Sequence, residues 1–194
     1  MKKYLIILFI GLLYSSNYMI AQNLKGLEQM KEMNDNIQRS KQVKEYLTHG
    51  HSKNYMYDGL FIEECRSKVL CNFELSDYAR DLLFFVEFCS MKSPGYTCSF
   101  YKSGNMDYQT LYINKGDLKE KFLEPNDSLT QYIVNEIKKG NLNLVLKQGE
   151  ASQSNNYVNI IIAKKQDKDY KIESYTTKYF ILDNKPNSKE SCNN

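Results

Sequence analysis

The first apolar run of the chain is short and lies at its N-terminus. Tyr4–Tyr14 follows two lysines and leads through a polar Ser15-Ser16-Asn17 stretch to the small residue Ala21. A positive start, a short apolar core and a small residue are the layout of a secretory signal peptide. The run is about half of the roughly 20 residues that a membrane-spanning helix needs. The pattern predicts a cleaved signal peptide over residues 1–21, with an uncleaved membrane anchor as the alternative.

The next pattern has helical spacing. Between residues 24 and 48, apolar residues alternate with charged ones and recur at roughly helical intervals: Leu24, Leu27, Met30, Met33, Ile37, Tyr46 and Leu47. We interpret this segment as a helix that covers a sheet, with its methionine-containing stripe in the core. The alternative is that the stripe is a partner-binding face. Gly50 is a plausible stop for the helix.

Strand-like patterns dominate the middle of the chain. Residues 55–62 fit a strand, whereas residues 63–73 are ambiguous. The aromatic run Leu82–Cys89 is followed by a turn at Pro94-Gly95, and Tyr96–Lys102 and Tyr108–Asn114 continue the pattern. These segments predict three consecutive strands of an antiparallel meander.

The second half of the pattern repeats this order of helix and strands. Residues 116–140 are predicted to be helical in two pieces broken at Pro125, the second with Leu129, Ile133, Val134 and Ile137 on one face. Three strands are predicted to follow, at Leu142–Lys147, Tyr157–Lys164 and Tyr170–Tyr179. The predicted fold is α+β, with a curved antiparallel sheet packed against an N-terminal helix and a second central helix. Residues 22–183 form one domain, and the polar residues 184–194 form a disordered tail.

The net charge and composition limit the classes of partner that the chain is expected to bind. The chain has 26 basic and 23 acidic residues, so removal of Lys2 and Lys3 with the signal peptide leaves 24 against 23. A net charge of +1 gives no reason to expect nucleic acid or an anionic membrane as partner. No membrane span is expected after signal cleavage. The apolar fraction of 42% suffices for a packed core of ordinary size.

Cysteines form the densest group of reactive residues. Cys65, Cys71, Cys89 and Cys98 lie close together in the sequence, and Cys192 stands alone in the tail. An oxidising compartment favours disulfides, for which three connectivities exist. We favour Cys89–Cys98 across the predicted hairpin, which leaves Cys65–Cys71. Six residues of helix would separate the latter Cα atoms by about 9 Å, so that pair requires an interrupted helix. A zinc site is the rival interpretation, although no C-x2-C unit is present.

The only two histidines are His49 and His51. On an extended segment both imidazoles project to the same side, so they could bind one metal ion with a carboxylate from Asp58, Glu63 or Glu64. The simpler interpretation is a solvated turn after a helix, and no cofactor is expected.

Tyrosines offer a second candidate surface. The chain has 16 tyrosines, and Tyr55 with Tyr57, and Tyr108 with Tyr112, share one side of their predicted strands. Amphipathic rings suit recognition of a protein, peptide or glycan. The alternative is that these rings cover sheet faces and core edges.

The closing segment YVNIIIAKKQDKDYKIESYTTKYF resembles the last strands of secreted NTF2-like or cystatin-like domains. In these an apolar strand runs through a short charged turn into an aromatic-Lys-Ile strand, here Tyr170-Lys171-Ile172. The resemblance covers the last third of the chain and implies a curved sheet wrapped around one or two helices. Such domains include both enzymes and binding proteins, so the resemblance leaves function open.

Three functional hypotheses follow. The chain lacks a G-x-S-x-G elbow, an H-E-x-x-H motif and a Gly-rich phosphate loop, which favours a binding protein over an enzyme. The first hypothesis is therefore an exported, disulfide-stabilised binding protein, periplasmic or extracellular, such as an inhibitor or immunity-type protein. The second is a metal-dependent hydrolase that uses His49 and His51, and the third is an envelope component linked through Cys192.

Overall fold

The computed structural model describes residues 2–49, 59–90, 95–104, 108–114, 120–123 and 128–182. Its centre is a six-stranded sheet in the order β4-β3-β2-β1-β5-β6, in which every neighbouring pair is antiparallel. The strands are β1 (Leu82–Ser90), β2 (Gly95–Lys102), β3 (Gln109–Asn114), β4 (Glu120–Leu123), β5 (Tyr157–Gln166) and β6 (Asp169–Lys178). The described helices are α1 (Lys2–His49), α2 (Gly59–Leu70), the 3-10 helix η1 (Leu75–Ala79), α3 (Ser128–Lys138) and α4 (Leu142–Glu150). The predicted α+β class is confirmed.

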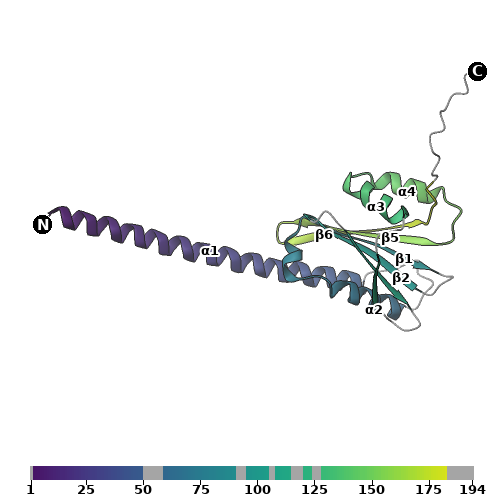
Figure 1. Ribbon diagram of the computed structural model, residues 1–194, viewed down its shortest axis with the longest axis horizontal. Coiled ribbons are helices and arrows are strands. Elements are labelled where there is room, and N and C mark those ends of the chain that lie inside the picture. Colours follow the sequence, from purple (N-terminus) through teal and green to yellow (C-terminus); the bar gives the residue numbers. More distant parts are fainter. Residues whose placement is uncertain are drawn as a thin grey trace, which may run out of the picture.

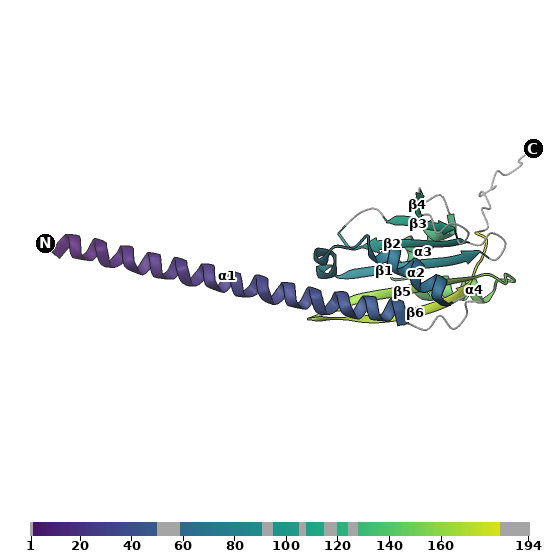
Figure 2. The same cartoon turned by 90° about the horizontal axis from the view of Figure 1, so that it is seen from below.

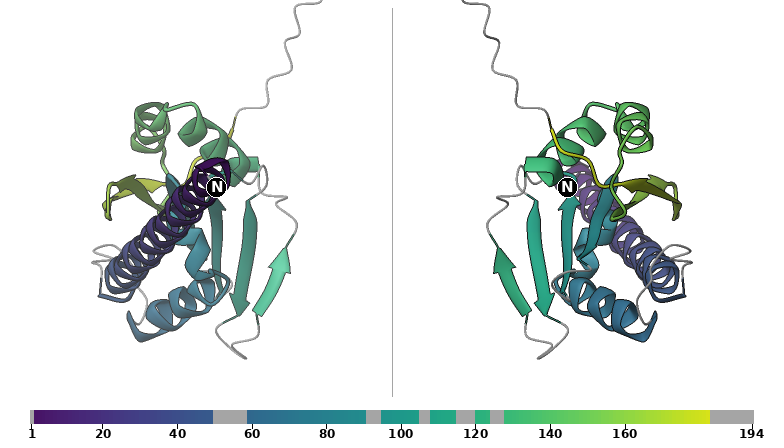
Figure 3. Two further views of the ribbon diagram at one scale, coloured as in Figure 1. Left: turned by 90° about the vertical axis from the view of Figure 1, so that its left-hand side faces the viewer. Right: turned by 90° about the vertical axis from the view of Figure 1, so that its right-hand side faces the viewer.

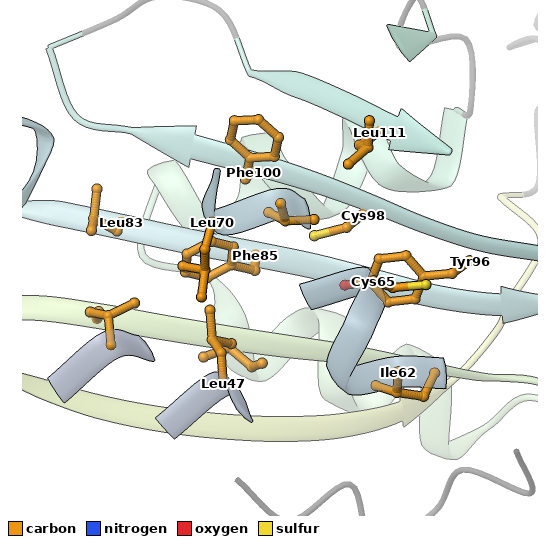
Figure 4. Packing of buried hydrophobic residues seen from close by; sticks show 14 of the residues in the cluster. Leu47, Ile62, Cys65, Leu70, Leu83, Phe85, Tyr96, Cys98, Phe100 and Leu111 are labelled. Carbon is orange, nitrogen blue, oxygen red and sulfur yellow. The ribbon is translucent and has the colours of Figure 1, made fainter. Parts of the chain in front are cut away.

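Helices cover both faces of the sheet (Figures 1 and 3). On one face, the C-terminal part of α1 and the whole of α2 pack on alternate residues of the central strands, including Phe85, Tyr96 and Phe100 (Figure 4). On the other face, α3 and α4 pack on Phe84, Val86 and their neighbours in β5. Because side chains of a strand alternate between faces, the continuous apolar run of β1 supplies both cores.

The N-terminal half of α1 projects away from the sheet (Figures 1 and 2). The predicted core stripe is consequently solvent-exposed, with exposed fractions between 39% and 62%: Leu24, Leu27, Met30, Met33 and Ile37. Val43 and Leu47 pack into the core, and Tyr46 packs against it. The prediction of a helix over residues 24–48 is confirmed. The assignment of its stripe to the core is right for Tyr46 and Leu47 and wrong for the five exposed residues between Leu24 and Ile37.

The docked part of α1 is partly polar. Arg39 is buried and donates to the carbonyl oxygens of Tyr78 (2.5 Å) and Asp167 (2.8 Å). Asp167 has a φ of 47°, and it lies in the tight turn between β5 and β6. The guanidinium thus ties α1 to η1 and to this turn.

The predicted strands of the meander and the closing hairpin are confirmed, with shifts of one or two residues at their ends. Three other assignments are corrected. Residues 59–62, expected in a strand, begin α2, and Leu142–Lys147, expected as a strand, lie in α4. Residues 120–123, expected in a helix, form β4, whereas the second predicted piece is α3 with its predicted face buried. The predicted tail lies outside the described residues.

Candidate functional site

β6 is an edge strand, and it presents unpaired backbone groups along much of its length. Tyr170 exchanges both backbone hydrogen bonds with the side-chain amide of Gln42 (2.7 and 2.8 Å), whereas Tyr179, just beyond β6, donates to Asn156 in the direction of β5 (2.8 Å). Backbone groups of successive residues point to opposite sides of a strand. The even-numbered residues Ile172, Ser174 and Thr176 therefore direct their N–H and C=O groups away from β5.

The two ends of this edge are occupied by helices. Gln42 of α1 occupies the edge at Tyr170. At the other end α4 approaches so closely that a Cβ atom on Gly149 would lie 1.6 Å from the hydroxyl oxygen of Thr177 and 3.0 Å from the carbonyl oxygen of Lys178. Between them, among the described residues, no hydrogen bond from another segment reaches the outward backbone groups of Ile172, Ser174 and Thr176.

A groove with a cavity volume of about 540 Å³ lies at the α4 end of this open stretch, from Ser174 to Lys178. Its lining comes from α4, from the start of β5 and from β6: Leu146, Gly149, Glu150, Tyr157, Ser174, Tyr175, Thr176, Thr177 and Lys178. The Thr177 side chain is buried, with 5% exposure for the residue, and within the described structure its hydroxyl oxygen has no hydrogen-bond partner. An uncompensated buried hydroxyl is costly, and this one lies against the backbone of α4 at Gly149.

The charged side chains along β6 and its groove differ in whether they have an ion-pair partner. Lys171 and Glu173 form an ion pair of 2.7 Å. The hydrogen bond from Lys171 and a second from Tyr175 hold the pKa of Glu173 below its usual range, and burial raises the pKa of Tyr175. Glu150 is exposed, and no described residue forms a hydrogen bond or ion pair with its carboxylate. The closed end of the groove therefore carries a carboxylate open to a ligand.

A second polar cluster is buried within the core. Arg66 of α2 donates two hydrogen bonds of 2.7 Å to the carboxylate of Glu87 in β1, and the hydroxyl of Tyr96 donates a third (2.8 Å). Arg66 also donates to the carbonyl oxygen of Leu47 near the end of α1 (2.9 Å). Arg66 and Glu87 are 4% and 1% exposed. This arrangement joins two helices to the sheet and leaves the carboxylate inaccessible to a substrate.

The two predicted disulfides have different outcomes. Cys65 and Cys71 are free thiols, and helical hydrogen bonding continues to Cys71, which donates to Ser67 (3.1 Å). The pairing of these two residues is therefore wrong, since a continuous helix holds their Cα atoms too far apart. Cys98 lies opposite Glu87 and Cys89 opposite Tyr96, one diagonal step apart. Diagonal partners lie about 7–8 Å apart, slightly beyond the usual Cα–Cα range of a disulfide. Because the Cys89 side chain lies outside the described residues, this pairing stays a prediction.

The other predicted site residues are not brought together. His51, Tyr55, Tyr57 and Cys192 lie outside the described residues, as does the side chain of His49. Tyr108 and Tyr112 are half-buried and lie on the sheet face that α3 and α4 cover, away from β6. Within the described part of the chain, no group of three or more His, Cys, Asp or Glu side chains is placed to hold a metal ion.

Comparison with known proteins adds no assignment. No family model, curated protein or solved structure matches the chain. The resemblance of the closing hairpin to NTF2-like or cystatin-like domains therefore stays a prediction. Among the described residues, no helix has the length and apolar character required to cross a membrane.

Sequence reasoning found β6 but not the site on it. The alternating pattern of β6 identifies a strand, yet its edge position depends on the order of strands in the sheet, which the local pattern does not carry. Gln42 and Gly149 have no distinguishing sequence signal, because their roles arise only when α1 and α4 meet the two ends of the strand.

Proposed function

We propose that the chain is an exported binding protein that captures an extended polypeptide segment as a seventh strand along β6. The observation that carries this proposal is the open stretch of outward-facing backbone groups at Ile172, Ser174 and Thr176, bounded by Gln42 and Gly149. Strand addition to a sheet edge is a common mode of peptide recognition, in which backbone hydrogen bonds supply affinity and side-chain contacts supply specificity.

The boundaries of the edge define the length of the captured segment. Six residues of β6, from Lys171 to Thr176, lie between the residues contacted by α1 and α4. At about 3.4 Å per residue, an added strand of about five or six residues fits this length. The other edge strand, β4, is only four residues long and offers a shorter template.

The test compares two substitutions of Ser174. Ser174→Pro removes one outward N–H without removing a bond to β5, and Ser174→Ala keeps that N–H. Peptides are selected on the mature protein from random twelve-residue phage libraries, displayed with free N-termini and, separately, with free C-termini. We expect the selected peptides to slow amide hydrogen exchange at Ile172, Ser174 and Thr176 and to bind Ser174→Ala like the wild type. Binding to Ser174→Pro should fall at least tenfold while its thermal stability stays close to that of Ser174→Ala.

The proposal would be overturned if the selected peptides bound Ser174→Pro and Ser174→Ala equally well, because such binding would not need the edge. It would also be overturned if neither library gave a binder that protects β6. An inhibitor or immunity-type activity is one form that such capture can take, in which the captured segment belongs to a target protein.

Export is supported by the N-terminal pattern and is tested separately. The intact mass of native protein should show loss of residues 1–21, and retention of these residues would support the membrane-anchor alternative. The metal-dependent hydrolase stays a prediction, since His51 and the His49 side chain lie outside the described residues. No observation in the described structure favours it.

A further inference from the structure

The edge groove is closed at one end. α4 meets β6 at Thr177 and Lys178, where a Cβ atom on Gly149 would lie 3.0 Å from the carbonyl oxygen of Lys178, which by the alternation along β6 points away from β5. A strand added along Ile172, Ser174 and Thr176 therefore cannot continue straight past Thr177. The captured segment must end there or leave the sheet plane, and an end of the chain meets this constraint without a turn.

The chemistry at the closed end favours a cation. The exposed carboxylate of Glu150 lies there, at the last residue of α4, without an ion-pair partner among the described residues. The C-terminal end of a helix carries a partial negative charge from its unpaired carbonyl groups. Lys178, the cation in the groove lining, donates to the carbonyl oxygen of Ser152 (3.3 Å).

Strand direction decides which end of a peptide reaches this point. Every pair in the sheet is antiparallel, and antiparallel pairing is slightly more stable per residue than parallel pairing. β6 runs from Asp169 to Lys178, so a strand antiparallel to it begins at the α4 end. Its N-terminus, which carries a positive α-ammonium group, then lies beside Glu150.

We propose that the groove takes the N-terminal segment of a partner polypeptide, antiparallel to β6, with its α-ammonium group held by Glu150. This inference rests on the strand-addition function proposed above and specifies its ligand. The side chains of the segment alternate between two surroundings. Those on the α4 side face Leu146 and Tyr175, and those on the opposite side face the hydroxyls of Ser174 and Thr176. An apolar residue is favoured at the first kind of position and a Ser or Thr residue at the second.

The experiment uses the peptides selected on the mature wild-type protein. Each is synthesised with a free N-terminus, with an acetylated N-terminus, and with a free N-terminus in which every lysine is replaced by glutamine. Affinities are measured for the wild type and for Glu150→Gln by isothermal titration calorimetry at low and at physiological salt. Glu28→Gln, which removes an equally exposed carboxylate from the projecting part of α1, is the matched control.

We expect acetylation to weaken binding about five- to tenfold for the wild type and to have little effect for Glu150→Gln. Glu28→Gln should behave like the wild type, and lysine replacement should leave affinity unchanged. A loss on lysine replacement but not on acetylation would overturn the inference, because the cation would then be a side chain. Equal binding of free and acetylated peptides, with β6 still protected from exchange, would overturn it while leaving strand addition intact.

Failure of the proposed strand-addition function would give results different from those that overturn only the inference about the N-terminus. If no peptide from either library protects β6, both proposals fail. A concentration-dependent dimer in sedimentation velocity, with Ile172, Ser174 and Thr176 protected in the absence of peptide, would identify a second copy of this chain as the occupant and overturn the inference.

Discussion

The buried Arg66–Glu87 pair offers a quantitative test of how the helices are joined to the sheet. Arg66→Met removes the guanidinium that donates two 2.7 Å hydrogen bonds to Glu87 and leaves that carboxylate, 1% exposed, without its cation. Breaking a buried pair by removing one partner costs about 3–5 kcal/mol. Against a typical stability of about 5–15 kcal/mol, this substitution should bring the domain close to unfolding.

The double variant Arg66→Met/Glu87→Leu should recover most of this loss. It removes both charges, so the remaining cost comes from the Tyr96 hydroxyl and the Leu47 carbonyl, which each lose a hydrogen bond described above. We expect it to lie within about 2 kcal/mol of the wild type, because apolar replacement of a complete buried pair is often nearly neutral. The single variants and the double variant therefore form a strongly non-additive cycle.

Urea unfolding at low temperature, followed by circular dichroism, measures the four free energies. If Arg66→Met fails to fold, Arg66→Lys keeps the charge but loses the two-pronged geometry and extends the measurable range. The exposed pair Lys171–Glu173 is the control, and Lys171→Met should lower the free energy of unfolding far less than Arg66→Met does, because exposed ion pairs contribute little. Additive effects in the Arg66–Glu87 cycle, or a cost of Arg66→Met as small as that of Lys171→Met, would refute the reasoning.

Three further outcomes are expected. Gly149→Ala should cost about 1–2 kcal/mol in urea titrations because its Cβ would overlap a β6 hydroxyl at 1.6 Å, whereas Gly26→Ala, whose Cβ meets nothing within 4 Å, should cost nothing. Met30→Ser should change stability by less than about 0.5 kcal/mol because this side chain is 59% exposed; a loss above 2 kcal/mol would place it in the core. Burial raises the pKa of Cys65 from 9.0 to about 12, so a thiol reagent at pH 8 should label Cys71 and spare Cys65 in the folded protein. Since the unfolded thiol ionises near pH 9 and the folded one does not, this group should make the free energy of unfolding fall as pH rises between these values, a slope that Cys65→Ala removes.

The sequence predicts the strands of the sheet better than the shorter helices. The sequence pattern predicts five strands because their aromatic and β-branched runs are bounded by recognisable turns: β1, β2, β3, β5 and β6. The pattern of residues 142–147 wrongly predicts a strand, because apolar and polar residues alternate at the start of the segment. In α4 the burial follows helical spacing instead, with Val145 and Gly149 buried and Leu144 exposed. For such short apolar runs, periodicity alone does not separate a strand from a helix.

The candidate site is less accessible to sequence reasoning than the fold. An edge strand has no neighbouring strand on one of its sides. The outer side of β6 has no paired strand as a result of the pairing of β1 with both β2 and β5. No local pattern in β6 records that pairing. Glycine is unusual near the end of a helix, but the requirement for it at position 149 is explained only by the close approach of α4 to Thr177.

The misassigned stripe of α1 has a geometric explanation. Leu24, Leu27, Met30 and Met33 are spaced by three residues, and each step of three rotates a helix by about 300°, so the stripe shifts by about half a turn from its first member to its last. Such residues cannot share one flat contact with a sheet. The buried positions Asn36, Arg39, Ser40, Val43 and Leu47 keep a 3.6-residue period and form the actual docking face. That face is more polar than the stripe and is held by the hydrogen bonds of Arg39 and Gln42, so hydrophobicity alone selects the wrong side of the helix. Among the α1 residues whose side chains are described, docking is therefore confined to the stretch from Asn36 to Leu47, where the buried positions follow the period of the helix.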